Sequence, residues 1–162
     1  MKVQFVKPEI SDVPGIYDLF SQLKRDGHEI TFANIDDPGE IVDWIEDPLN
    51  QLYIARHNQQ IVGVMRAKLG TGPTSHSCEI TIAVSAEYRQ QGIAKSLVNY
   101  GLSDVRHQGI TVARGMVFSD NKASLNTLLS SGFSVTGSIL KHHYNEKSSL
   151  YVDDVTLFKE LG

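Results

Sequence analysis

The sequence predicts a mixed α/β (α+β) domain in which helices cover a β-sheet. Two observations indicate this class. In the first half of the chain, two segments of helical period precede three strand-like runs. In the second half, strand-like and helical segments alternate in the order β-α-β-α-β. The length of 162 residues and the 41% share of hydrophobic residues suit a single domain over residues 1–162 with one well-filled core.

The first half opens with a strand-like run at residues 3–5, which is followed by a helix. Asp12 is the expected N-cap of that helix, and Pro14 lies in its first turn. A second helix is expected over residues 38–46 and ends before the next proline. The apolar face of the first helix is formed by Ile16, Leu19, Phe20 and Leu23.

Three strand-like runs come next, at residues 51–55, 61–67 and 78–84. A polar turn at residues 58–60 separates the first two runs, which are expected to form a hairpin. The third run alternates with period two, which is typical of a strand whose two faces differ.

Helical period returns after Arg89 and continues to a Gln-Gly pair at residues 108 and 109. A later short helix has Ser119, Asp120 or Asn121 as its candidate N-cap and ends at Gly132. The remaining predicted elements are a strand at 110–117, that helix at 122–131, and closing strands at 133–135 and 151–159.

Charge and composition exclude several classes of protein. The formal net charge is −4, whereas a general nucleic-acid-binding protein usually carries a basic face. The single cysteine, Cys78, cannot form an internal disulfide and is expected to pack on a core strand. No run approaches the roughly 18 apolar residues of a membrane span, and the N-terminus lacks the apolar run of a signal peptide. We therefore expect a soluble cytoplasmic protein that contacts neither nucleic acid nor membrane.

The segment from Arg89 to Ser96 joins a strand to a helix and is the candidate ligand-binding loop. A helix N-terminus offers unpaired backbone N–H groups and a partial positive charge, so a diphosphate fits there if side chains do not block it. Gly92 and Ala94 are small, and Lys95 adds positive charge. Three interpretations fit the loop alone: a nucleoside-triphosphate P-loop, a structural glycine without a ligand, and an acyl-CoA diphosphate site. The P-loop pattern needs Gly at positions 89 and 94, where this chain has Arg and Ala.

A second motif lies about thirty residues further on and decides among these interpretations. It consists of Asn121, a helix of small residues, and the pair Gly132–Phe133. Together with the first loop and the Ala-Val strand before it, this motif resembles the signatures of the GNAT family of N-acetyltransferases. The resemblance extends to the order of strands and helices over most of the chain. It implies a GNAT-type acyl-CoA N-acyltransferase fold, with a central mixed, mostly antiparallel twisted sheet, a splayed strand pair and helices on both faces.

The resemblance also implies acetyl-CoA as the co-substrate, with no metal. In the family, the pantetheine arm lies against the strand before the loop, the loop amides bind the diphosphate, and an Asn contacts the pantetheine side. In this chain Asn121 is also a candidate helix cap. The implied acetyl-CoA-binding residues are Ile82, Ala83, Val84, Arg89, Gln90, Gln91, Gly92, Ile93, Ala94, Lys95, Asn121 and Ser124.

Acyl transfer to an amine needs a base, since an α-amino group has a pKa of about 7.7–8.0 and a lysine about 10.4. Glu79 is the candidate base, because a glutamate on this strand serves as base in several GNAT members; a solvated strand carboxylate is the alternative. Many GNAT enzymes have a Tyr five residues before the Phe of the Gly-Phe pair, as the acid for the departing thiolate. This chain has Leu128 there. Either the thiolate leaves unassisted, or another group such as Tyr144 or Ser124 donates the proton.

Two further segments resemble GNAT enzymes that acetylate small amino acids or their analogues. The first is residues 29–33 with 40–45, which in those enzymes helps to line the acceptor pocket; Glu29 is a candidate contact for an ammonium group, or a surface charge at a helix end. The second is the chain ending from 141 to 155. Its histidines, His142 and His143, are adjacent on a strand, so they are expected to point to opposite faces and to form no metal site.

The sequence therefore predicts an N-acetyltransferase that moves the acetyl group from acetyl-CoA to the primary amine of a small molecule, an amino acid or analogue. The expected route is direct attack in a ternary complex. The alternatives are acetylation of a protein N-terminus or lysine, and a non-catalytic acyl-CoA-binding module. A homodimer is suggested by the family resemblance alone.

Overall fold

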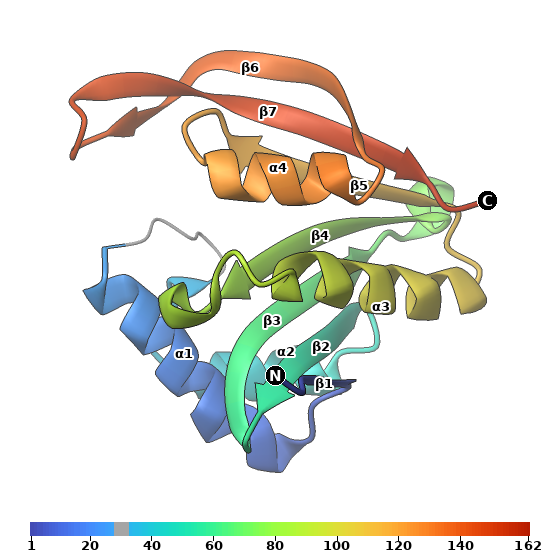
Figure 1. The fold of residues 1–162 in the computed structure, drawn as a ribbon. Coiled ribbons are helices and arrows are strands. Elements are labelled where there is room, and N and C mark those ends of the chain that lie inside the picture. The colour runs from blue at the N-terminus through green and yellow to red at the C-terminus, as the bar shows by residue number, and fades with distance from the viewer. Residues whose placement is uncertain (28–32) are drawn as a thin grey trace.

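Seven strands form one mixed sheet in the computed structural model, which describes residues 1–27 and 33–162 (Figure 1). The strand order is β1-β2-β3-β4-β5-β7-β6. Neighbouring strands are antiparallel except β4 and β5, which run parallel. This confirms the predicted fold class. The strands are β1 (Gln4–Val6), β2 (Asn50–His57), β3 (Gln60–Leu69), β4 (Ser77–Val84), β5 (Val112–Phe118), β6 (Ser134–Asn145) and β7 (Leu150–Glu160).

The last two strands form a long hairpin at one edge of the sheet. The sequence predicted a strand at residues 133–135, whereas β6 covers twelve residues, and all of them except Asn145 are exposed. An exposed edge strand has no apolar side to bury, so its sequence lacks the alternation by which strands are detected. The predicted limits of the first closing strand were therefore wrong.

Helices cover both faces of the sheet. The helices α1 (Val13–Arg25) and α2 (Gly39–Glu46) lie on one face, and α3 (Ile93–His107) and α4 (Lys122–Ser130) lie on the other (Figure 1). Short 3-10 turns occur at Ile10–Asp12, Gly72–Thr74 and Ala86–Tyr88. None of the helices in the described part of the chain is long and apolar enough to cross a membrane.

The start of α1 differs from the prediction in one respect. Pro14 lies in the first turn, as expected, but Asp12 makes no side-chain cap. Its carboxylate instead accepts a hydrogen bond from the Glu9 amide at 2.8 Å and forms an ion pair with Arg56 on β2. The tertiary partner on β2 therefore replaces the local cap.

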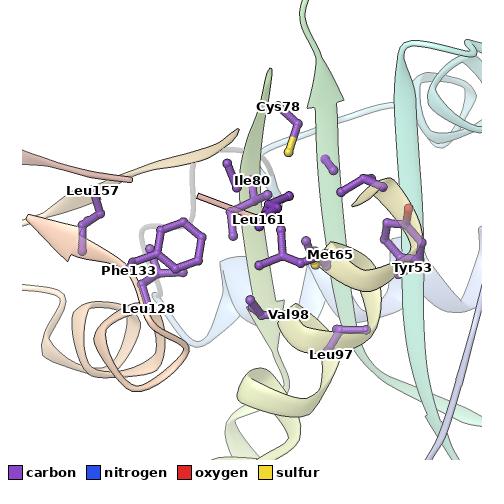
Figure 2. Close-up of a cluster of buried hydrophobic side chains, with 14 of the residues drawn as sticks. Tyr53, Met65, Cys78, Ile80, Leu97, Val98, Leu128, Phe133, Leu157 and Leu161 are labelled. Carbon is purple, nitrogen blue, oxygen red and sulfur yellow. The ribbon is translucent and has the colours of Figure 1, made fainter. Parts of the chain in front are cut away.

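Two buried clusters flank the sheet. Neighbouring residues on one strand belong to different clusters, because side chains alternate between faces: on β2, Tyr53 packs toward α3 and Ile54 toward α1 and α2. Figure 2 shows the cluster on the α3 and α4 face, with Leu128 and Phe133 beside each other. Cys78 is buried in this cluster, as its position on a core strand predicted.

The parallel pair β4–β5 separates partway along its length. The two strands are paired from Ser77 to Ile80 of β4 and from Val112 to Gly115 of β5. Beyond Gly115, β5 continues beside β7, whereas the rest of β4 continues beside β3. In the described chain, the edge of β4 from Thr81 to Val84 that faces β5 thus has no strand partner. This is the splayed strand pair that the family resemblance implied.

Candidate acetyl-CoA site

A cavity of about 790 Å³ lies where β4 separates from β5. The open edge of β4 forms one wall through Ile82, Ala83 and Val84. The start of α3 and the inward side of α4 form two further walls, and the β6–β7 turn closes the remaining side. An open strand edge offers backbone N–H and C=O groups that an extended ligand can pair with. The cavity therefore suits a long ligand that carries amide groups.

The N-terminus of α3 is built to receive an anion. Gly92 is its N-cap, has a φ of 78°, and makes no side-chain cap. The first hydrogen bond within the helix is donated by the Ser96 amide to the Gly92 carbonyl at 3.0 Å. The amides of residues 93–95 come before it and have no acceptor within the helix. Gln90 also has a positive φ of 61°, which lets the loop turn tightly before the helix. Arg89 and Lys95 add positive charge at the same cavity wall.

The other side of the cavity is the first turn of α4. Asn121 caps this helix, since its Oδ1 accepts a hydrogen bond from the Ser124 amide at 3.2 Å. Asn121 also lines the cavity, so capping and ligand contact are compatible.

The structure brings together eleven of the twelve residues that the sequence assigned to the cofactor. Gln91 is exposed and lies outside the cavity lining. The eleven that line the cavity are Ile82, Ala83, Val84, Arg89, Gln90, Gly92, Ile93, Ala94, Lys95, Asn121 and Ser124.

Other residues also line the cavity and were not predicted from the sequence. Those on α4 follow from helical spacing once Asn121 is known, because positions three and four apart share a face. The residues on β5 and on the β6–β7 hairpin had no local signal. The missed residues are Gly27, Tyr88, Phe118, Asp120, Ala123, Asn126, Thr127, Ser130, Asn145 and Lys147.

Glu79 lies outside the cavity lining, on the part of β4 that is still paired with β5. It is exposed, opposite Lys68 on β3 and Arg114 on β5. Arg66 lies on the same face, because it is two residues from Lys68 on the same strand. Its guanidinium is 4.6 Å from the ring centroid of Trp44. Burial lowers the pKa of Arg66, and the nearby Glu79 carboxylate opposes this shift.

Leu128 is buried at the point where the two strands separate. Its side chain is 3% exposed and packs beside Gly115, in the last parallel pair of β5. Of the other acid candidates, Ser124 lines the cavity, and Tyr144 is exposed with its ring 5.1 Å from that of Tyr151. The predicted acceptor residues 29–32, including Glu29, lie outside the described residues.

The expectation that His142 and His143 point to opposite faces is wrong. The pairing of β6 with β7 shifts between Ile139 and His143, and Lys141 has a φ of 50°, so a bulge breaks the strand alternation. The rings of the two histidines are 4.8 Å apart. A ring nitrogen of each histidine and a carboxylate oxygen of Asp154 lie within 4.8 Å of one another, and these are atoms of the kind that can bind a metal ion. His143 Nδ1 is already hydrogen-bonded to Asp154 Oδ1, at 2.6 Å.

A splayed parallel strand pair, an open strand edge and an uncapped helix N-terminus are the features that the family resemblance implied for an acyl-CoA-dependent transferase. A model of the Acetyltransferase (GNAT) family matches residues 13–133, and the chain belongs to this family. It is thus an acetyl-CoA-dependent acyltransferase. A search of curated proteins finds no match.

Solved structures share the fold at low sequence identity. One is yncA of Salmonella typhimurium, a provisionally assigned acetyltransferase solved with its cofactor acetyl-CoA: TM-score 0.87, 15% identity, covering 99% of this chain and 94% of that one. A ribosomal-protein-alanine N-acetyltransferase from Brucella melitensis has a TM-score of 0.84 and 18% identity, covering 97% and 99% of the two chains. A protein provisionally assigned as a phosphinothricin N-acetyltransferase has a TM-score of 0.83 and 18% identity, covering 99% of each chain.

Proposed function

We propose that the protein transfers the acetyl group of acetyl-CoA to the primary amine of a small molecule, an amino acid or an analogue. The observation that carries this proposal is a contact between the β6–β7 turn and the end of α1. Lys147 Nζ donates a hydrogen bond to the carbonyl oxygen of Gly27, and both residues line the cavity. A peptide substrate needs an open groove, whereas this hydrogen bond joins two parts of the cavity wall. A small acceptor fits such an enclosure better.

The charge pattern on β3, β4 and β5 supports a zwitterionic acceptor. On the face of the sheet that carries α1 and α2, the carboxylate of Glu79 lies among the cationic side chains of Arg66, Lys68 and Arg114. An amino acid presents an ammonium and a carboxylate close together, so neighbouring charges of both signs match it. Among solved structures with this fold, the provisionally assigned phosphinothricin N-acetyltransferase has a name that refers to a small-molecule acceptor.

In this proposal acetyl-CoA occupies the cavity described above. The diphosphate binds the amides at the start of α3, where Arg89 and Lys95 add charge, and the pantetheine arm lies along Ile82 to Val84. Asn121 and Ser124 contact the arm from α4. The acceptor amine then attacks the thioester carbonyl directly, and the CoA thiolate leaves.

Glu79 is the proposed group that meets the acceptor ammonium and takes its first proton, directly or through water. A carboxylate attracts a cationic ammonium group by opposite charge. The cytoplasmic location and the homodimer expected from the sequence remain predictions.

The test is thiol release from acetyl-CoA across a panel of free amino acids, their analogues, other amines, and peptides with free N-termini or lysines. Turnover with amino acids but not with peptides supports the proposal. Turnover with peptides alone would identify a protein acetyltransferase instead. Tight binding of acetyl-CoA without turnover on any amine would identify a non-catalytic module. Glu79→Gln should raise KM for the acceptor and lower kcat, and Glu87→Gln, on the turn before α3, is the matched control.

A further inference from the structure

A histidine and a buried aspartate form a hydrogen-bonded pair beside the cavity. His143 Nδ1 lies 2.6 Å from Asp154 Oδ1; the Asp154 side chain is 3% exposed and that of His143 is 47% exposed. An ionised carboxylate only accepts hydrogen bonds, so Nδ1 carries the proton and donates it to Asp154. The other ring nitrogen, Nε2, is then a hydrogen-bond acceptor in the neutral imidazole. A buried carboxylate thus fixes both the tautomer and the orientation of an accessible histidine.

This pair lies next to the cavity described above. The His143 ring stacks on Phe118, with centroids 4.6 Å apart, and Phe118 lines the cavity. Asp154 is directly opposite Phe118 in the β5–β7 ladder, so the three side chains share one face of the sheet. Two residues beyond His143, Asn145 also lines the cavity and donates a hydrogen bond to Asp120 at 2.8 Å. His143 is therefore at the cavity rim, one aromatic ring from its interior.

We infer that His143, held by Asp154, carries a proton from the attacking nitrogen to the departing CoA sulfur. This inference rests on the proposed function. After Glu79 has taken the first ammonium proton, the amine attacks the thioester carbonyl, and the new C–N bond leaves the nitrogen positively charged. His143 Nε2 takes one proton from that nitrogen. The C–S bond then breaks with its electron pair on sulfur, the C=O bond re-forms, and His143 returns the proton to give the CoA thiol and the neutral amide.

This assignment supplies the proton donor that the predicted catalytic residues lack. The place where many relatives have a tyrosine acid is occupied by Leu128, which has no proton to donate and is buried in the core. Glu79 has already taken the first ammonium proton in this scheme, so a second group must carry the next one. A histidine has an ordinary pKa of about 6.5, nearer to neutral pH than that of a carboxylate or a phenol, so it can both accept and donate a proton there.

The first experiment compares His143→Gln with His142→Gln, using the amine on which the wild-type protein turns over best. His142 is the matched control, because it is adjacent on the same exposed strand. His143→Gln should lower kcat by roughly 10²-fold or more, the usual effect of losing a positioned acid–base group. Its affinity for acetyl-CoA by calorimetry and its thermal midpoint should match the wild type. Added imidazole should restore part of the rate in His143→Ala but not in a Glu79→Gln variant.

The second experiment tests Asp154 as a positioning residue. Among the described residues, His143 contacts Asp154 on β7, His142 on β6 and the ring of Phe118 on β5. Asp154→Asn removes the carboxylate that holds the Nδ1–H of His143, so kcat should fall while KM for acetyl-CoA stays near the wild-type value. Side-chain ¹⁵N NMR should find the Nδ1–H tautomer of His143 in the wild type and lose that preference in Asp154→Asn.

The outcomes separate this inference from the proposed function. Wild-type turnover together with an unchanged kcat in His143→Gln would overturn the role of His143 and leave the proposed acetylation of small amines intact. An Nε2–H tautomer in the wild type would also overturn it, whatever the activity. Absence of wild-type turnover on every amine would overturn the proposed function, and the inference with it. Equal losses in His143→Gln and His142→Gln would indicate a structural effect of the hairpin and contradict the assignment.

Discussion

A Cβ atom added to Gly115 would lie 2.9 Å from Cδ1 of Leu128. Gly115 pairs with Ile80 at the last rung of the parallel β4–β5 ladder, so Leu128 fills the space that the missing side chain leaves at the point of separation. A contact at 2.9 Å is closer than carbon atoms approach in packed interiors. The absence of a side chain at residue 115 and the leucine at residue 128 are therefore matched, and apolar packing holds the vertex of the splayed pair.

Substitutions at this vertex should be coupled. Leu128→Ala should lower the free energy of unfolding by about 2–5 kcal/mol, because it leaves a cavity in the core. Gly115→Ala should cost about 1–3 kcal/mol by overpacking. The double variant should be more stable than the sum of the two losses predicts, since alanine at 128 makes room for the new methyl group. Urea unfolding measures all three, and losses that add within about 0.5 kcal/mol would show that the two sites are independent.

Gly92→Glu should abolish acetyl-CoA binding. An added Cβ at Gly92 meets no heavy atom within 4 Å among the described residues, so the side chain would project into the space proposed for the diphosphate. Its negative charge would repel that group. The positive φ of 78° adds a backbone cost of about 1–2 kcal/mol. Calorimetric titration with acetyl-CoA measures the loss.

The matched control is Gly109→Glu, at the other end of α3. Gly109 also has a positive φ, of 96°, and open space around its Cβ position, but it does not line the cavity. This variant should show a similar fall in thermal stability and unchanged affinity. If Gly92→Glu bound acetyl-CoA as tightly as Gly109→Glu, the diphosphate would have to bind elsewhere.

Asn121 should have two separable roles. Asn121→Ala removes the acceptor of the Ser124 amide and should cost about 1 kcal/mol of stability, together with affinity for acetyl-CoA. Asn121→Ser keeps a capping oxygen but loses the amide group, so it should recover most of the stability without recovering the affinity. Thermal denaturation and calorimetry on the same samples distinguish the two effects. Full recovery of both in Asn121→Ser would leave Asn121 as a cap alone.

Cys78 should be unreactive in the folded protein. Burial raises the pKa of its thiol to about 11, with Arg114 acting in the opposite direction. The thiol is therefore protonated and covered at pH 8, and a disulfide reagent should modify it only after unfolding. Reaction of the native protein with such a reagent, followed by absorbance, checks this. If the native protein does not react, thiol-release assays report CoA alone.

The same pKa shift makes the stability of the protein depend on pH. Because the folded pKa of the Cys78 thiol is above the unfolded value of about 9, its contribution to the free energy of unfolding should be fully present below pH 9 and fall as pH rises toward 11.

The fold class and the cofactor side of the site were accessible from the sequence because their signals are local. The segment from Arg89 to Ser96 is contiguous, and a glycine before a helical period marks a helix start whatever lies around it. Asn121 and the Gly132–Phe133 pair mark the two ends of α4 in the same way. The residues that the family resemblance assigned to acetyl-CoA lie on these two helix starts and one strand, so their spacing along the chain specifies most of the cavity wall.

The acceptor side was decided by tertiary structure. Whether Lys147 meets Gly27 depends on contacts between segments 120 residues apart, which leave no periodic trace in the sequence. The exposed strand β6 has no buried face to reveal its length. The bulge at Lys141 brings together the rings of the two histidines that follow it, which were expected to point to opposite faces. Only the β5–β7–β6 pairing places His143 beside Asp154 and Phe118. The sequence by itself therefore determined the fold and most of the wall of the cavity proposed for the cofactor, since short-range patterns encode helix starts and core strands. The tertiary structure decided which side chains surround the proposed acceptor site, because long-range strand pairing brings them together.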